Sequence, residues 1–283
     1  MLQTTISKPV LCSGVGVHSG VKTNVVFKPA LPETGVVFVR NGVTASDNKI
    51  RALYTNVCDT TLSTSIKNSS GVKVSTIEHI MAAIWGCGID NLIVEIDNAE
   101  APIMDGSSIE FVSILQKAGL TTQGVNKRKL KLLKPLNIKD GGSEIFLTPS
   151  QHLDVSVRID FDNKAIGQQE YSCDSKSMFL SDIANARTFG FLKDLDYLKQ
   201  RGLARAASLD NTIGIDGDEV MNPDGLRHNN EFARHKLLDL IGDFFCCGSD
   251  FIMQVRGNKT SHNINNIALH KIFENPANYS ILQ

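Results

Sequence analysis

The chain has 283 residues, of which 42% are hydrophobic and 21% are charged, and its formal net charge is −1. This composition is typical of a globular protein with a large core, and two domains are a better estimate than one at this length. The longest basic run is Lys127-Arg128-Lys129, so we expect no nucleic-acid partner. No stretch approaches the ~20 apolar residues of a transmembrane segment, and the N-terminus lacks a signal-peptide core. We therefore expect a cytoplasmic protein.

The six cysteines indicate reduced thiols. None forms a C-x-x-C pair, and adjacent Cys246 and Cys247 suit small buried residues at a helix end better than a bridge to each other. This pattern argues against a structural zinc bound by cysteine. Any metal site in this chain would use histidine and carboxylate ligands.

The first half of the chain begins with strands and turns. Short apolar runs between glycines predict strands over residues 10–39, and His18 in a glycine-bounded turn fits a structural role as well as a functional one. A helix is predicted from Ser75 to Gly86, where Ser75-x-x-Glu78 matches a capping box and gives Glu78 a structural role. His79 follows at the first turn, where side chains face any site beside the sheet. Taken alone, the Glu78-His79 pair favours the structural explanation.

A domain boundary is predicted in the polar stretch 121–129, which has no periodicity. It follows a strand at 91–96 and a helix over Ile109–Ala118, and it divides the chain into domains 1–124 and 125–283. The second half repeats the order of strands and then helices. Strands are predicted at 129–138, 143–148, 153–161, 168–173, 209–215, 219–221 and 251–256, and helices after Ser181 and over 192–201, 230–245 and 267–273. This order predicts an α+β fold with two layered domains.

The helix predicted at 230–245 carries a polar stripe. His235, Asp239 and Asp243 are spaced by four residues, which places them on one side over two turns. An imidazole and a carboxylate at this spacing can bind one cation. By itself the stripe favours a solvated face or a His–Asp pair that supports the fold.

Histidines at three element ends can form one catalytic site. His79, His235 and Asp239 supply the three ligands that a catalytic zinc needs beside an open position for water. Glu78 could then act as general base. His262, held by Asp243, would favour its cationic form and could protonate a leaving amine. Composition and spacing permit this arrangement without proving it.

The chain closely resembles the zinc-dependent UDP-3-O-acyl-N-acetylglucosamine deacetylases of lipid A biosynthesis. The matching segments span nearly the whole chain and are Gly14–Gly20, Ser75–Ala83, Gly88–Leu92, Pro102–Ser107, Ala186–Phe191, Asn222–Leu226 and Phe232–Asp243. The resemblance implies two α+β sandwich domains with the active site between them. It also implies hydrolytic deacetylation of an acylated UDP-sugar to the free 2-amine and acetate, the committed step of lipid A biosynthesis, by a protein that we expect to be a monomer.

The resemblance also implies roles for single residues. Zinc ligands fall on His79, His235 and Asp239, and Fe²⁺ would tolerate the same set. The general base falls on Glu78, and a second acid–base histidine falls on His262, oriented by Asp243. Thr188 matches a threonine that stabilises the oxyanion, and the implied substrate contacts are Lys236, Phe189 and Leu62. The acyl chain would occupy an apolar passage near 191–195 and 203–212.

Four positions depart from the family pattern, and two other function classes stay open. Ser261 replaces a glycine, Ala206-Ala207 replaces paired glycines, Ser63 replaces a cysteine, and Thr148-Pro149 replaces a Lys-Pro linked to nucleotide binding. The Ala206-Ala207 pair bears on the acyl-chain length that the site prefers. Thr148-Pro149 bears on the contact with the substrate diphosphate. The alternatives are a non-metal hydro-lyase acting on an acyl chain and a metal-binding protein without catalysis. Glu78, Thr188 and His262 argue against the second, because binding alone needs none of them.

Overall fold

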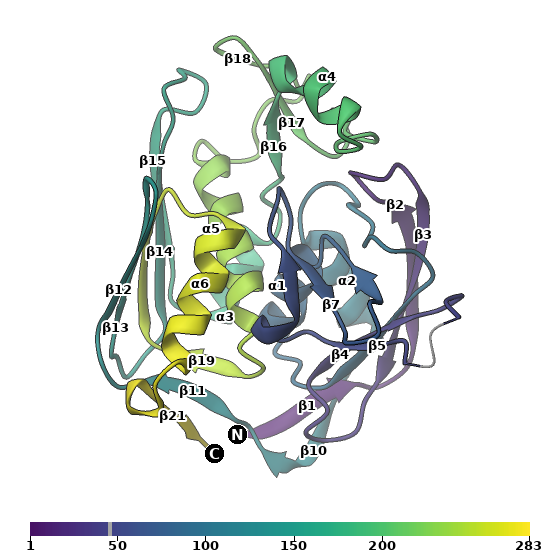
Figure 1. Cartoon of the computed structure of the whole chain (residues 1–283), viewed down its shortest axis with the longest axis vertical. Helices are drawn as coiled ribbons and strands as arrows, with labels where there is room; N and C mark the ends of the chain where they lie inside the picture. The colour runs from purple at the N-terminus through teal and green to yellow at the C-terminus, as the bar shows by residue number, and fades with distance from the viewer. Residues whose placement is uncertain (45–46) are drawn as a thin grey trace.

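Two large mixed sheets form the outer layers of the molecule, and helices fill the space between them (Figure 1). This computed structural model describes residues 1–44 and 47–283. One sheet lies at the left of Figure 1 and the other at the right, with α1, α2, α5 and α6 between. The predicted α+β class is confirmed.

The first large sheet is built from the N-terminal half of the chain. Its strand order is β2-β3-β9-β4-β5, and β4 runs parallel to β9 while the other neighbours are antiparallel. The strands are Val10–Val15, Lys22–Pro29, Leu92–Ile96, Val36–Arg40 and Lys49–Arg51 in that order. Buried residues alternate along β3, as expected for a sheet with one face on the core.

The second large sheet has the same topology as the first. Its order is β12-β13-β20-β14-β15, and β14 runs parallel to β20. The strands are Leu136–Asp140, Ser143–Thr148, Gln254–Asn258, Asp154–Asp160 and Gln168–Cys173. In each sheet the central strand is therefore the last of the five in sequence. The repeated order predicted from the sequence is a repeated fold, although the strand lengths and connections differ.

Corresponding helices of the two halves meet at the centre. Helix α1 (Glu78–Gly86) precedes the central strand β9, and α5 (Glu231–Phe245) precedes the central strand β20. Helices α2 (Ile109–Ala118) and α6 (His262–Phe273) follow those strands. Every residue of α1 is buried, and α1 packs on α5 more extensively than on any other described element. The first turn of α1 thereby lies against the later turns of α5.

A glycine permits the close approach of these two helices. A Cβ atom at Gly242 of α5 would lie 2.1 Å from the carbonyl oxygen of Glu78 on α1. No side chain can be accommodated at that distance from backbone. Gly242 therefore decides how close the start of α1 lies to the polar stripe of α5.

Smaller elements complete the two halves. Each half carries an insertion before its central helix: β6, β7 and β8 in the first, and β16, α4, β17 and β18 in the second. Their bounds are Val57–Asp59, Ser65–Lys67 and Lys73–Val74, then Phe189–Phe191, Leu192–Gln200, Ile213–Asp216 and Glu219–Val220. The remaining elements are β1 (Leu2–Ile6) with β10 (Leu120–Asn126), β11 (Lys129–Leu132) with β19 (Asp250–Ile252) and β21 (Tyr279–Leu282), α3 (Lys176–Met178), a π-helical turn at Phe179–Ile183, and 3₁₀ turns at Tyr54–Asn56 and Pro276–Asn278.

Several predicted bounds of strands and helices were wrong. The sequence predicts no strand in the polar stretch 121–129, but β10 occupies Leu120–Asn126 because it pairs with β1. The strand expected at 129–138 is two strands in different sheets, and the strand expected at 209–215 begins at Ile213. The last helix begins at His262 instead of residue 267. Pairing partners far away in sequence account for the strand errors.

The six cysteines are free, as predicted. Within residues 1–44 and 47–283, the helices are too short or too polar to span a bilayer.

Candidate active site

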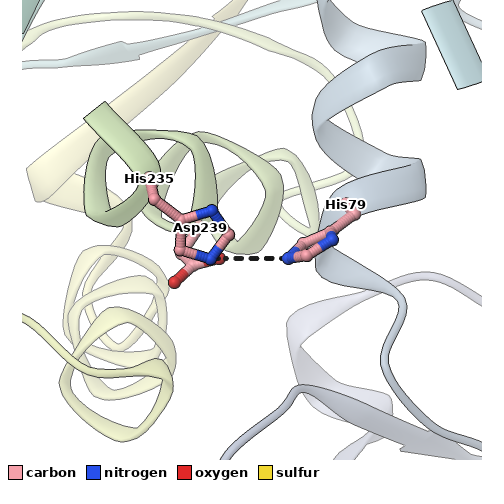
Figure 2. A group of neighbouring side chains, drawn as sticks. All are labelled: His79, His235 and Asp239. Atoms are coloured by element: carbon pink, nitrogen blue, oxygen red, sulfur yellow. Dashed lines mark ion pairs between the residues drawn. The ribbon is translucent and has the colours of Figure 1, made fainter. Parts of the chain in front are cut away.

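Two imidazoles and a carboxylate converge where α1 meets α5. His79 is the second residue of α1, and His235 and Asp239 lie one turn apart on α5 (Figure 2). The Asp239 Oδ1 atom lies 3.6 Å from His79 Nε2 and 3.4 Å from His235 Nε2. One ligand atom from each side chain lies within 4.8 Å of the others, and all three side chains are buried. The sequence prediction that these three residues come together is confirmed by this geometry.

The donor atoms of this cluster fit a divalent cation. The Nδ1–H group of His235 can donate to the Ala186 carbonyl at 3.1 Å, which leaves the Nε2 lone pair directed at the cluster. Asp239 Oδ2 accepts a hydrogen bond from Lys236 at 2.7 Å. Among the described residues, buried Asp239 Oδ1 has no hydrogen-bond partner. A buried anionic oxygen without a donor is costly, and a cation held by two imidazoles would remove that cost.

The protonation states of the cluster also suit metal ligands. Burial lowers the pKa of His235 to about 4, so the imidazole is neutral near pH 7. Burial alone would raise the pKa of Asp239, but His235 and Lys236 outweigh it and hold this pKa well below its usual range. Metal ligands must be deprotonated, and both groups are.

Glu78 lies beside this cluster at the first position of α1. Its Oε2 atom accepts a hydrogen bond from the Thr64 backbone N–H at 2.9 Å, and the side chain is 3% exposed. The predicted capping box was wrong: Ile77 holds the N-cap position, and the Ser75 hydroxyl donates to the Ala99 carbonyl. Burial raises the pKa of Glu78. Glu78 is therefore available for chemistry and is not used as a helix cap.

His262 and Asp243 form the expected pair. His262 Nδ1 lies 2.8 Å from Asp243 Oδ2, and both side chains are buried. Burial alone would lower the pKa of His262, but the carboxylates of Asp243, Glu78 and Asp239 outweigh it and raise this pKa to about 9. Ser261 caps α6 by accepting from the Ile264 N–H. The serine that departs from the family pattern thus fixes the helix start that carries His262.

A largely apolar cavity of about 510 Å³ opens beside Glu78 and His79. Thr188, Phe189 and Leu62 line it, as do residues from both segments predicted to form the acyl passage. Ala207 lines the cavity, whereas the Ala206 N–H donates to the Val17 carbonyl. Lys236 and His262 are outside the lining and contact Asp239 and Asp243 instead.

Sequence reasoning missed three contributors to the site. Ala186 orients His235 through its carbonyl, and Thr64 and Asn265 donate to buried carboxylates. A backbone carbonyl carries no sequence signal. Thr64 lies in a Thr/Ser-rich stretch without a motif, and Asn265 lies before the helix predicted at 267–273.

The fold and this cluster define an α+β protein with a buried site able to hold a metal ion between its two halves. Residues 3–274 match the profile of the family described as UDP-3-O-acyl N-acetylglycosamine deacetylase. The chain is 42% identical over 277 residues to the UDP-3-O-acyl-N-acetylglucosamine deacetylase of Phenylobacterium zucineum (strain HLK1), covering 98% of this chain and 94% of that protein. It is 43% identical to the enzyme of the same name from Myxococcus xanthus (strain DK1622), covering 99% and 89%. A relative of the same name from Histophilus somni (strain 129Pt) is 40% identical, covering 96% and 90%. The chain therefore belongs to this deacetylase family.

Proposed function

We propose that this protein hydrolyses the acetamide of a UDP-3-O-(3-hydroxyacyl)-N-acetylglucosamine to the free 2-amine and acetate, the committed step of lipid A biosynthesis. The observation that carries the proposal is the buried His79, His235 and Asp239 cluster with Glu78 beside it, next to an apolar cavity that Glu78 and His79 line. The names of the relatives supply the substrate class.

The metal proposed for this cluster is Zn²⁺, with Fe²⁺ as the alternative. When bound, such an ion would polarise the acetamide carbonyl and lower the pKa of a water molecule. His79, His235 and Asp239 would hold it. The Ala186 carbonyl and Lys236 keep two of these ligands oriented through 3.1 Å and 2.7 Å contacts.

The protein's own residues would divide the proton transfers. Glu78 takes a proton from the attacking water, and its raised pKa brings it closer to neutral pH than an exposed glutamate. Water oxygen adds to the acetamide carbonyl carbon to form the new C–O bond, and the C–N bond breaks when this tetrahedral adduct collapses. The hydroxyl of Thr188 donates to the developing oxyanion. The leaving nitrogen receives its proton from cationic His262 or from Glu78, and acetate leaves as the second product.

The remaining residues would bind substrate. The cavity beside Phe191 and Leu195 has the apolar lining that an acyl chain requires. Phe189 packs against His235 with ring centroids 6.3 Å apart, so it can limit where the sugar lies. Lys236 contacts Asp239 in this structure and is 22% exposed, which leaves it within reach of a sugar hydroxyl. Leu62 also lines the cavity.

The domain division at 124/125, a monomeric state and a cytoplasmic location belong to the same proposal. Residue 124 lies inside β10, which pairs with β1. A boundary after β10, near residue 127, would keep this pair intact.

Chelation separates this proposal from its two alternatives. We expect the chain to hold about one metal ion, to release acetate from the acylated UDP-sugar, and to lose turnover on chelation. Zn²⁺ addition should restore it. Turnover that survives metal removal would indicate a hydro-lyase or another non-metal enzyme, and a metal-loaded protein that releases no acetate would indicate binding alone.

Glu78→Gln tests the assignment of the base. Glutamine keeps an acceptor for the Thr64 N–H but cannot take a proton, so we expect kcat to fall by about 10²–10⁴-fold. Metal content, measured by plasma emission, should remain that of the wild-type chain. Near-normal turnover by this variant would show that another group is the base.

A further inference from the structure

Thr64 contacts both carboxylates that flank the proposed metal cluster. Its backbone N–H donates to Glu78 Oε2 at 2.9 Å, and its side-chain hydroxyl donates to Asp243 Oδ1. Its carbonyl accepts from the Ile77 N–H at 3.2 Å, next to the start of α1. Thr64 itself is 2% exposed. One residue before β7 therefore joins α1 to α5 through buried polar contacts.

The hydroxyl of Thr64 and the amide of Asn265 occupy different oxygens of Asp243. Thr64 donates to Oδ1, while Asn265 Nδ2 donates to Oδ2 at 2.9 Å and His262 Nδ1 lies 2.8 Å from the same Oδ2. The terminal torsion of an aspartate is broad, so a carboxylate bound on one side can rotate. Donors on both oxygens remove that freedom and keep Oδ2 facing the imidazole.

We propose that Thr64 and Asn265 are positioning residues, which act through Asp243 to hold His262 in the orientation needed for proton transfer. This inference rests on the proposed deacetylase function and goes beyond it by assigning two residues that act through another. Thr64 has the larger share, because it is the described donor to Oδ1 and its backbone also fixes Glu78. The ring of His262 gives Nδ1–H to Asp243 and keeps Nε2 for proton exchange.

Thr64→Val tests the role of the hydroxyl, because valine keeps the shape and the backbone N–H. We expect kcat to fall about tenfold, equivalent to about 1.4 kcal/mol, with KM within about twofold of wild type. Thr64→Ser restores a hydroxyl and should recover kcat to within about threefold. Thr5→Val is the matched control. Thr5 is buried on β1, and its hydroxyl donates to the Asn91 carbonyl at 2.7 Å. Neither residue belongs to the proposed cluster. It should lower stability and leave kcat unchanged.

A second genetic background, His262→Ala, distinguishes a positioning role of Thr64 from a general contribution to stability. In a His262→Ala chain, Thr64→Val should cost no further kcat, because the hydroxyl acts through Asp243 on a ring that is no longer present. The same fractional loss in both backgrounds would overturn the proposal, as would a wild-type kcat in Thr64→Val. If Thr64→Val does not fold, Asn265→Ala is compared in the same two backgrounds and must show the same non-additivity.

One readout does not depend on turnover. The Nδ1 proton of His262 should exchange with solvent faster in Thr64→Val than in wild type or Thr64→Ser, as followed by proton NMR on the metal-loaded protein. Unchanged exchange would contradict the proposal. If the wild-type protein released no acetate, the proposed function would be refuted instead. Failure of the positioning proposal and failure of the proposed function are therefore distinguishable.

Discussion

Single side chains of the site are set by burial and by their neighbours. His235 and His262 are both buried histidines, yet burial lowers the pKa of the first to about 4 and nearby carboxylates raise that of the second to about 9. Burial dominates at His235, where His79 and Lys236 also oppose a charge and Asp239 offsets them only in part, whereas Asp243 binds His262 directly at 2.8 Å. One imidazole is suited to a metal and the other to carrying a proton.

The raised pKa of His262 predicts a pH-dependent stability of the metal-free protein. The folded value of about 9 lies above the unfolded value of 6.5, so this contribution is fully present below about pH 6.5 and is lost as the pH rises through about 9. The shift corresponds to at most about 3 kcal/mol. The free energy of unfolding, measured with urea from pH 6 to 10, should show this decline. His262→Gln should remove it, and an unchanged decline in that variant would assign the pH dependence to another group.

At the scale of elements, two packing contacts set the shape of the site. The start of α1 reaches α5 because Gly242 has no side chain. The apolar cavity beside Glu78 and His79 is lined by α4 and the 203–212 segment. Both contacts can be altered without changing a proposed ligand. Each therefore gives a prediction that separates position from chemistry.

Gly242→Ala should displace the first turn of α1. Its Cβ would lie 2.1 Å from the Glu78 carbonyl, so the helix must shift. Such overpacking typically costs about 1–3 kcal/mol of folding free energy. A small misplacement of Glu78 and His79 should also lower kcat by roughly 10²-fold. This loss of rate occurs in the folded protein and is separate from the loss of stability. Gly124→Ala, where a Cβ has open space, is the control for calorimetry and turnover.

Ala207→Leu should narrow the cavity and change chain-length preference. Ala207 lines it, so three added carbons occupy space proposed for the acyl chain. We expect kcat/KM for a long-chain substrate to fall about tenfold or more relative to a short-chain one, since each lost methylene contact costs about 0.8 kcal/mol. Ala206→Ser, outside the lining, should leave the ratio unchanged. An equal loss for both chain lengths would place the acyl chain elsewhere.

The whole molecule is two copies of one topology joined through their central helices. Each half contributes to the proposed metal cluster, His79 from the first and His235 with Asp239 from the second. Further contacts join them: Trp85 Nε1 donates to Asp250 at 3.0 Å, and Lys176 bonds the Trp85 carbonyl at 3.0 Å. Neither half can therefore complete the site alone.

Separated halves should lose both stability and metal affinity. In a fragment of residues 1–126, α1 would expose the apolar surface that α5 covers, and burial of such surface contributes about 25 cal/mol per Å². We expect this fragment to show no cooperative unfolding transition by circular dichroism and no tight Zn²⁺ binding by calorimetry. The full chain should unfold in one transition seen alike by both probes. A stably folded fragment would show that the halves are independent domains.

The sequence by itself determined the fold class, the central helices and the chemistry of the candidate ligands. Periodicity predicts α5 because its apolar face is local in sequence, and the four-residue spacing of His235 and Asp239 is a property of any helix. The positions of His79 and His235 at element ends permitted their grouping with Asp239, and the resemblance to known deacetylases assigned these three residues as ligands.

Tertiary structure alone decided the contacts that make the site work. Glu78 is freed from a capping role, Thr64 and Asn265 bind Asp243, and β10 forms from a polar stretch because β1 lies beside it. Each of these depends on a partner distant along the chain: residue 64 meets residue 243, and residue 4 meets residue 122. Local propensity and spacing carry no information about such partners. These contacts form only in the folded chain, where buried polar groups and open strand edges pair with donors and acceptors.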